Sequence, residues 1–136
     1  MAVRYVFDAC ALIAILRNEP GGADAAAIID DPDSLCFVHA INLCEIFYGV
    51  RREKGEQYAQ ARLSGFRDTG LTSRSDFDDE FWQEAGRLKS DYKRVSLADC
   101  FCAALAHRLG AEVVTGDRHE MEALASAGVC RIRFIR

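Results

Sequence analysis

The sequence predicts an α/β fold, a three-layer α/β/α arrangement around a mainly parallel central sheet. Two observations support this prediction. Short β-prone runs alternate along the chain with segments of helical spacing, an order that is typical of parallel sheets. The length of 136 residues lies near the commonest size of one domain, and no linker, internal repeat or low-complexity stretch divides it. We therefore expect a single domain over residues 1–136.

The first half of the chain begins with a β-prone run over residues 3–7, which predicts the first strand. The apolar segment 9–16 follows at once and predicts a helix, which Pro20 and the glycines after it end. The next elements are expected to be a helix over 23–29, a strand over 35–38 and two helices over 40–52 and 57–66.

The second half continues this alternation. A weak strand is expected over 70–72, and a helix over 77–92 begins among several acids that we interpret as solvated. The remaining elements are expected to be a strongly apolar helix over 97–109, a strand over 112–115, a helix over 121–127 and a strand over 130–135.

Composition excludes several classes of protein. Half of the residues are hydrophobic and 28% are charged, which is unlike a disordered chain. No apolar run is long enough to span a membrane, and the N-terminus lacks the pattern of a secretory signal, so we expect a soluble, cytoplasmic protein. The net charge of −4 argues against nucleic-acid binding by bulk charge alone.

The six cysteines lie in apolar segments without a Cys-x-x-Cys pair. This placement predicts buried, reduced thiols and argues against both a disulfide framework and a zinc site.

Three aspartates stand at the edges of apolar elements. Asp8 and Asp117 follow the strands predicted over 3–7 and 112–115, and Asp99 lies in the first turn of the most apolar helix. Each of them is also suited to capping a helix or a turn. That capping role alone would explain each aspartate taken singly.

A fourth acid, Glu45, lies within the helix predicted over 40–52, which is apolar on nearly every side. The exceptions Asn42, Glu45 and Gly49 form one narrow stripe at helical spacing. If this helix is buried all round, the Glu45 carboxylate must be paired with a buried arginine, protonated or bound to a metal.

A parallel sheet brings these four acids together, because ligands bind beyond the carboxyl ends of its strands. Two carboxylates about 5 Å apart repel by roughly 3 kcal/mol at an effective dielectric near 20. A divalent cation removes that repulsion, and an all-carboxylate set suits Mg²⁺ or Mn²⁺. A metal site used for phosphodiester hydrolysis is therefore the leading interpretation.

Around these acids the sequence resembles the PIN-domain nucleases, and most closely the VapC-type toxin ribonucleases of type II toxin–antitoxin systems. Four segments carry the resemblance: residues 6–13, 41–49, 97–106 and 113–117. It implies a PIN-like fold and an acidic tetrad of Asp8, Glu45, Asp99 and Asp117 that binds Mg²⁺ or Mn²⁺ and cleaves single-stranded RNA. It also implies a homodimer and a small antitoxin that blocks the pocket.

We expect Asp8, Asp99 and Asp117 to hold the metal and Glu45 to position or deprotonate water. Thr115 matches a position that often orients the metal-bound water or Asp117. Two positions depart from the family: Asn42 replaces a usual Ser or Thr, and Glu120 replaces a usual aromatic residue. Asn42 keeps hydrogen-bonding ability, whereas Glu120 adds another acid near the pocket.

Other functions stay open at this point. The leading alternative is a catalytically weak or inactive binding protein that acts through an RNA or antitoxin partner. A phospho-acceptor domain would need a lysine after a strand, and an aspartate-nucleophile phosphatase would need an acid where Cys10 stands. Exposed arginines near the C-terminus could contact RNA, although protection of a sheet edge explains them as well.

Overall fold

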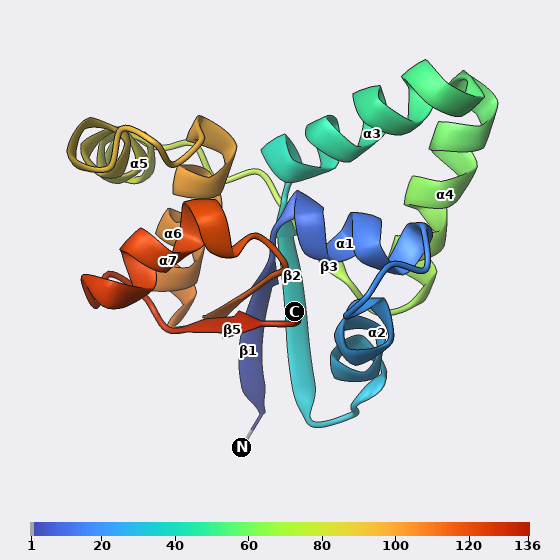
Figure 1. Cartoon of the computed structure of the whole chain (residues 1–136), viewed down its shortest axis with the longest axis horizontal. Helices are drawn as coiled ribbons and strands as arrows, with labels where there is room; N and C mark the ends of the chain where they lie inside the picture. Colours follow the sequence, from blue (N-terminus) through green and yellow to red (C-terminus); the bar gives the residue numbers. More distant parts are fainter. Residues whose placement is uncertain (1) are drawn as a thin grey trace.

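A computed structural model describes residues 2–136, which form one parallel sheet with helices on both of its faces (Figure 1). The strands are β1 (Val3–Phe7), β2 (Ser34–His39), β3 (Thr72–Arg74), β4 (Glu112–Thr115) and β5 (Ile132–Phe134). The helices are α1 (Ala9–Leu16), α2 (Gly22–Asp30), α3 (Ala40–Lys54), α4 (Glu56–Asp68), α5 (Asp79–Asp91), α6 (Leu97–Leu109) and α7 (Arg118–Ser126). The predicted α/β architecture is confirmed, and every strand pairing is parallel.

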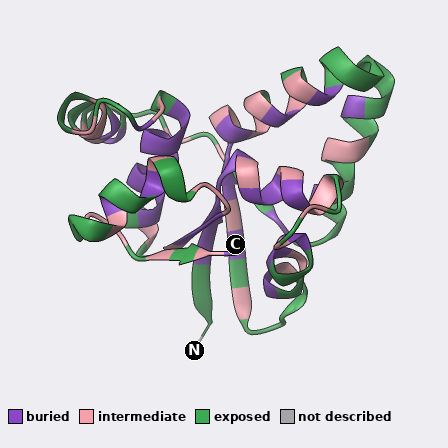
Figure 2. Cartoon of the chain, viewed as in Figure 1, coloured by how far each residue is buried: buried purple, intermediate pink, exposed green. Residues whose placement is uncertain are grey.

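The strand order is β3-β2-β1-β4-β5, which places β1 at the centre. Because successive residues of a strand point to opposite faces of the sheet, β1 contributes side chains to two hydrophobic cores. Phe7 packs with Leu12 and Ile46 on the face that α1 to α4 cover. Val6 packs with Leu105 on the face that α5 to α7 cover. Figure 2 shows the buried residues gathered along the sheet and on the inner sides of the helices.

Helices α3 and α4 form a hairpin that extends from one end of the sheet (Figure 1). Cys44 and Tyr48 are exposed on α3, so the prediction that this helix is buried all round is wrong. The reason is that α3 contacts α1, α4 and α6 on one side and leaves its other side to solvent. Cys44 likewise departs from the expectation of buried thiols, although all six cysteines are free.

Two element boundaries differ from the predictions for identifiable reasons. Helix α7 begins at Arg118, earlier than expected, because Asp117 caps it by accepting a hydrogen bond from the amide of Glu120. The edge strand β3 begins at Thr72, after Gly70, whose positive φ makes the turn out of α4. Among the described residues, no helix combines the length and apolar character needed to cross a membrane.

Candidate metal centre

The central strands β1 and β4 are parallel neighbours, so their carboxyl ends lie at one edge of the sheet. Strand β2, which follows β1 in the chain, pairs with one edge of β1, whereas β4 pairs with its other edge. In open α/β sheets, ligands bind beyond the strand ends at such a reversal, and this region is called the crevice here. Asp8 follows β1 directly and Asp117 stands two residues beyond β4, so both begin helices at this crevice.

Asp8 is buried and held at both of its carboxylate oxygens. Oδ1 accepts a hydrogen bond from the amide of Ala11 at 2.8 Å, which makes Asp8 the N-cap of α1. Oδ2 accepts a hydrogen bond from the hydroxyl of Thr115. Burial, which leaves only 1% of the residue exposed, raises the pKa of Asp8 to about 7 against these stabilising hydrogen bonds. Asp8 is therefore a cap and a fixed carboxylate at the crevice.

Asp117 is joined to the same hydroxyl. Its amide donates a hydrogen bond to Oγ1 of Thr115 at 2.9 Å, and its Oδ1 accepts one from the amide of Glu120 at 3.1 Å. Thr115 thus links the caps of α1 and α7 across the two central strands.

Asp99 lies in the first turn of α6, where its amide donates to the Ser96 hydroxyl at 3.1 Å. The N-cap of α6 is therefore Ser96, and the cap uses the amide of Asp99 rather than its carboxylate. Burial, a side-chain hydrogen bond with Glu120 and the charges of the neighbouring acids, Asp8 and Glu45 among them, together raise the pKa of Asp99 to about 9. These neighbours show that Asp99 lies among the other acids of the crevice.

Glu45 is half-buried, and no ion pair among residues 2–136 includes it. A buried arginine partner, the alternative that the sequence left open, is thus not found in the described structure. Desolvation raises the pKa of Glu45, and the charge of Glu120 raises it further. The acids predicted to form the site are therefore brought to one region, from four different elements.

Glu120 is a candidate site residue to which the sequence pattern assigned no role. Its carboxylate, with those of Asp99 and Asp117, offers three oxygen atoms that all lie within 4.8 Å of one another. The available signal was its spacing of three residues from Asp117, which places it in the same helical turn once α7 begins at Arg118. The sequence indicates that Glu120 lies near the pocket, but the later helix start expected from the sequence did not put it in a helical turn with Asp117.

The residues present fit a hard divalent cation. All candidate ligands are carboxylate oxygens, which Mg²⁺ and Mn²⁺ prefer. Beside them, on the same face of α3 as Glu45, lies Asn42, which is fully buried. Its amide nitrogen donates to the carbonyl of Ala98 at 3.5 Å, but its Oδ1 has no partner among the described residues. A buried acceptor without a partner among the described residues calls for a donor from outside them, such as a water molecule.

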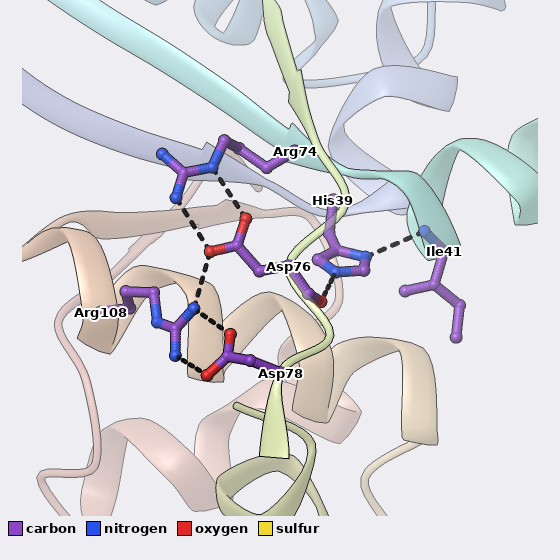
Figure 3. Close-up of polar contacts among 6 residues, drawn as sticks. All are labelled: His39, Ile41, Arg74, Asp76, Asp78 and Arg108. Atoms are coloured by element: carbon purple, nitrogen blue, oxygen red, sulfur yellow. Dashed lines mark hydrogen bonds and ion pairs between the residues drawn. The ribbon is translucent and has the colours of Figure 1, made fainter. Parts of the chain in front are cut away.

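A separate ionic network joins the end of β3, the segment before α5 and helix α6, as Figure 3 shows. Asp76 accepts hydrogen bonds from Arg74 at 2.8 Å and from Arg108 at 3.0 Å, and these cations lower the pKa of Asp76 to about 2. Arg108 also pairs with Asp78. The interpretation of these acids as solvated is therefore wrong for Asp76, because α6 brings Arg108 against the segment before α5.

His39 connects this network to the start of α3. Its Nδ1 accepts from the amide of Ile41 at 3.0 Å, so its Nε2 carries the proton and donates to the carbonyl of Asp76 at 2.9 Å (Figure 3). The ring stacks on Phe81 with centroids 5.4 Å apart. His39 thereby fixes the first turn of α3, which positions Asn42 and, one turn later, Glu45.

Comparison with known proteins supports this fold. Residues 5–126 match the family model of the PIN domain. Among solved structures, the chain is similar to VapBC2 from Rickettsia felis bound to a DNA fragment from its promoter, with 17% identity and a TM-score of 0.74 over 97% of this chain and 98% of that chain. It is also similar to a toxin–antitoxin complex from Klebsiella pneumoniae, with 19% identity and a TM-score of 0.71 over 97% and 98% of the two chains.

A third similar structure is VapC20 from Mycobacterium tuberculosis, described as a toxin that cleaves the sarcin–ricin loop. It has 17% identity and a TM-score of 0.66 over 88% of this chain and 94% of that chain. No match was found among curated proteins. At these identities the structural similarities establish the fold, and the match of the family model covers most of the chain.

Proposed function

The chain belongs to the PIN domain family, whose members are typically metal-dependent nucleases, and from this premise we propose that it is a Mg²⁺- or Mn²⁺-dependent endoribonuclease. The observation that carries the proposal is the group of carboxylates at the ends of β1 and β4, for which residues 2–136 provide no cationic partner. Such a group is costly to fold unless protons or a cation compensate its charge. In the proposed role that cation is used for hydrolysis of a phosphodiester.

Asp8, Asp99 and Asp117 would hold the metal. A hard divalent cation supplies charge that lowers the pKa of bound water and stabilises the leaving oxygen. The rigid hydrogen bonds of Asp8 to Ala11 and Thr115 fix its carboxylate before any ligand arrives. This preorganisation avoids the cost of ordering the site during the reaction.

Glu45 is the proposed base that positions and deprotonates the attacking water. Its partial exposure leaves the carboxylate within reach of a substrate, in contrast to the buried Asp8. Desolvation and the charge of Glu120 raise the pKa of Glu45, which makes its carboxylate a better proton acceptor. His39 and Asn42 act on Glu45 indirectly, because they fix the start of α3.

RNA is the proposed substrate. The family and the similarity to VapC20, a toxin that cleaves the sarcin–ricin loop, support this choice. Exposed Arg118 lies next to Asp117, and Arg131 and Arg133 are exposed at the β5 edge of the sheet. These guanidinium groups are suited to binding phosphates. Action on cellular RNA would place the protein in the cytoplasm.

A small antitoxin and a second copy of the chain are the proposed protein partners. Similar structures include a toxin–antitoxin complex from Klebsiella pneumoniae and VapBC2 bound to promoter DNA. In this proposal the chain is the toxin of such a pair and works as a homodimer, and the antitoxin blocks the carboxylate crevice. The alternative is a catalytically weak or inactive PIN-like protein that acts through its antitoxin or RNA partner.

The test uses the purified chain without any partner, incubated with a mixed RNA pool in Mn²⁺ or in EDTA. We expect cleavage that requires the metal and is lost in Asp99→Asn, whereas the exposed control Asp33→Asn retains it. Melting curves must show that Asp99→Asn is folded. Intact RNA together with no rise in melting temperature on adding Mn²⁺ would reject the nuclease and favour the binding protein.

A further inference from the structure

We propose that the solvent side of α3 beyond Glu45 binds single-stranded RNA and leads it to the crevice. Three residues, Tyr48, Gly49 and Arg52, form this surface, which we call the α3 face. The inference rests on the proposed ribonuclease function and deepens it, because it assigns residues that bind the substrate rather than cleave it.

Helix α3 begins at the carboxyl end of β2, next to the crevice, and extends away from the sheet (Figure 1). Its buried residues are Asn42, Ile46 and Val50. Tyr48 is 49% exposed and Arg52 is exposed, and they stand three and seven residues after Glu45. At 3.6 residues per turn, Arg52 lies almost in line with Glu45, about 10 Å farther along the helix axis. A strand that contacts Glu45 and continues along this side of α3 therefore meets Tyr48 and Arg52.

Tyr48 and Arg52 form a stacked pair whose charge is not compensated. The guanidinium carbon of Arg52 lies 5.4 Å from the centre of the Tyr48 ring. No ion pair among residues 2–136 includes Arg52, so its guanidinium can bind a phosphate. The exposed ring offers a stacking surface to a nucleobase of any identity. Together they match a single strand, which presents bases and phosphates side by side.

The neighbouring Arg51 provides a contrast on the same helix. Its Nε donates to Oε1 of Glu56 at 3.0 Å, so an acid compensates its charge. Basic residues in the last turn of a helix stabilise its negative end, and this effect accounts for Arg51 and Arg52 alike. It does not call for an exposed tyrosine beside Arg52. The stacked pair is therefore the feature that points to a ligand.

Gly49 lies between Glu45 and Arg52 along α3. A glycine inside a helix is less stable than alanine, and close packing does not require it here, because a Cβ at Gly49 would meet no atom within 4 Å. The missing side chain leaves the surface beyond Glu45 open. An RNA strand can therefore lie against the backbone between Glu45 and the stacked pair.

The test measures how the purified chain binds a short, fluorescein-labelled single-stranded RNA of random sequence, by fluorescence anisotropy in EDTA, where the proposed cleavage cannot occur. We expect Arg52→Ala and Tyr48→Leu each to weaken binding by about tenfold. Arg52→Ala should also lower the slope of log affinity against log salt concentration, whereas Tyr48→Leu should leave this slope unchanged. The matched controls Arg51→Ala and Tyr48→Phe should bind within about twofold of the unchanged chain, because Arg51 is already paired and phenylalanine still stacks.

Gly49→Gln separates binding from stability. It replaces a helical glycine with a good helix former and should raise the melting temperature, while its side chain obstructs the α3 face and weakens RNA binding. Melting curves also show that the other variants are folded. If the unchanged chain binds RNA too weakly in EDTA to be measured, the same order of effects is expected in KM, rather than in kcat, for Mn²⁺-dependent cleavage.

Two outcomes would overturn this inference alone and leave metal-dependent cleavage standing. Equal weakening by Arg51→Ala and Arg52→Ala would assign RNA binding to bulk charge. Unaltered RNA binding by folded Tyr48→Leu and Gly49→Gln would assign the α3 face to a protein partner instead. An unchanged chain that neither binds RNA nor cleaves it in Mn²⁺ would overturn the proposed function together with the inference.

Discussion

The hydroxyl of Thr115 donates a hydrogen bond to the carboxylate of Asp8, across 107 residues of sequence. The same oxygen accepts a hydrogen bond from the amide of Asp117 at 2.9 Å. One buried side chain at the end of β4 therefore fixes the residues that begin α1 and α7. The relative position of two candidate metal ligands depends on this single hydroxyl.

Replacing Thr115 with Val should loosen this link and lower the stability of the protein. The change preserves the shape of the side chain but leaves the buried Asp8 oxygen without a donor, at a cost of about 1–3 kcal/mol in the free energy of unfolding. Urea denaturation in EDTA measures the loss. Thr115→Ser keeps the hydroxyl and should therefore lose less stability than Thr115→Val. The reverse order would show that the methyl group contributes more to stability than the hydrogen bond.

The metal-free protein should become less stable as the pH rises. Burial raises the pKa of Asp8 to about 7 and that of Asp99 to about 9, whereas an unfolded aspartate titrates near pH ~3.9. Between these values the folded chain binds more protons than the unfolded chain, so the free energy of unfolding falls with increasing pH. Melting temperatures in EDTA should therefore drop from about pH 5 to about pH 9.

Mn²⁺ should restore much of the stability that the protein loses at high pH, because a cation replaces the protons on the carboxylates. The difference in melting temperature with and without Mn²⁺ should grow as the pH rises. Asp99→Asn removes one of the titrating groups and should flatten the pH profile in EDTA. A profile for Asp99→Asn parallel to that of the unchanged chain would contradict the assignment.

The strands and helices could be predicted from the sequence because the patterns that indicate them lie within short segments of the chain. Alternating apolar runs predicted the parallel sheet, and the position of Asp8 after β1 predicted its place at the crevice. What could not be predicted depends on contacts between distant segments. The exposure of one side of α3 follows from its contacts with α1, α4 and α6 on the other side, and the burial of Asp76 follows from the approach of Arg108.

Glu120 illustrates the same limit within the site. Its proximity to Asp99 depends on how α6 and α7 meet and on where the cap of α7 begins. Asn42 is similar, because its unpaired oxygen becomes visible only when the partner of its amide nitrogen, the Ala98 carbonyl, is known. Spacing along one helix placed Asn42 beside Glu45, but it gave no information about α6.

Replacing Asp76 with Asn should destabilise the protein near neutral pH. Hydrogen bonds from Arg74 and Arg108 lower the pKa of Asp76 to about 2, so the ionised form stabilises the fold above the unfolded pKa and loses this effect as the pH falls toward 2 (Figure 3). We expect a loss of about 1–2 kcal/mol in the free energy of unfolding at pH ~7, measured by urea denaturation. The exposed Asp33→Asn serves as the control. The difference in the free energy of unfolding between Asp76→Asn and the unchanged chain should shrink below pH ~3. A difference that stays constant with pH would show that the charge of Asp76 is unimportant.

The effect of Gly116→Ala on stability should depend on Arg136, and it should change sign when Arg136 is replaced by alanine. A Cβ at Gly116 would lie 2.9 Å from Nε of Arg136 and 3.2 Å from Sγ of Cys10. Gly116→Ala should therefore displace the guanidinium from Glu19 and from the carbonyl of Pro20, with a small loss of stability.

In the background of Arg136→Ala the closer of these two obstructions is gone, and Gly116 has no positive φ that would disfavour alanine. There Gly116→Ala should be neutral or stabilise by about 0.4–1 kcal/mol, because it lowers the entropy of the unfolded chain. A double-mutant cycle measured by urea denaturation separates the two effects. Equal destabilisation by Gly116→Ala in both backgrounds would assign the cost to the backbone or to Cys10, and would remove Arg136 from the explanation.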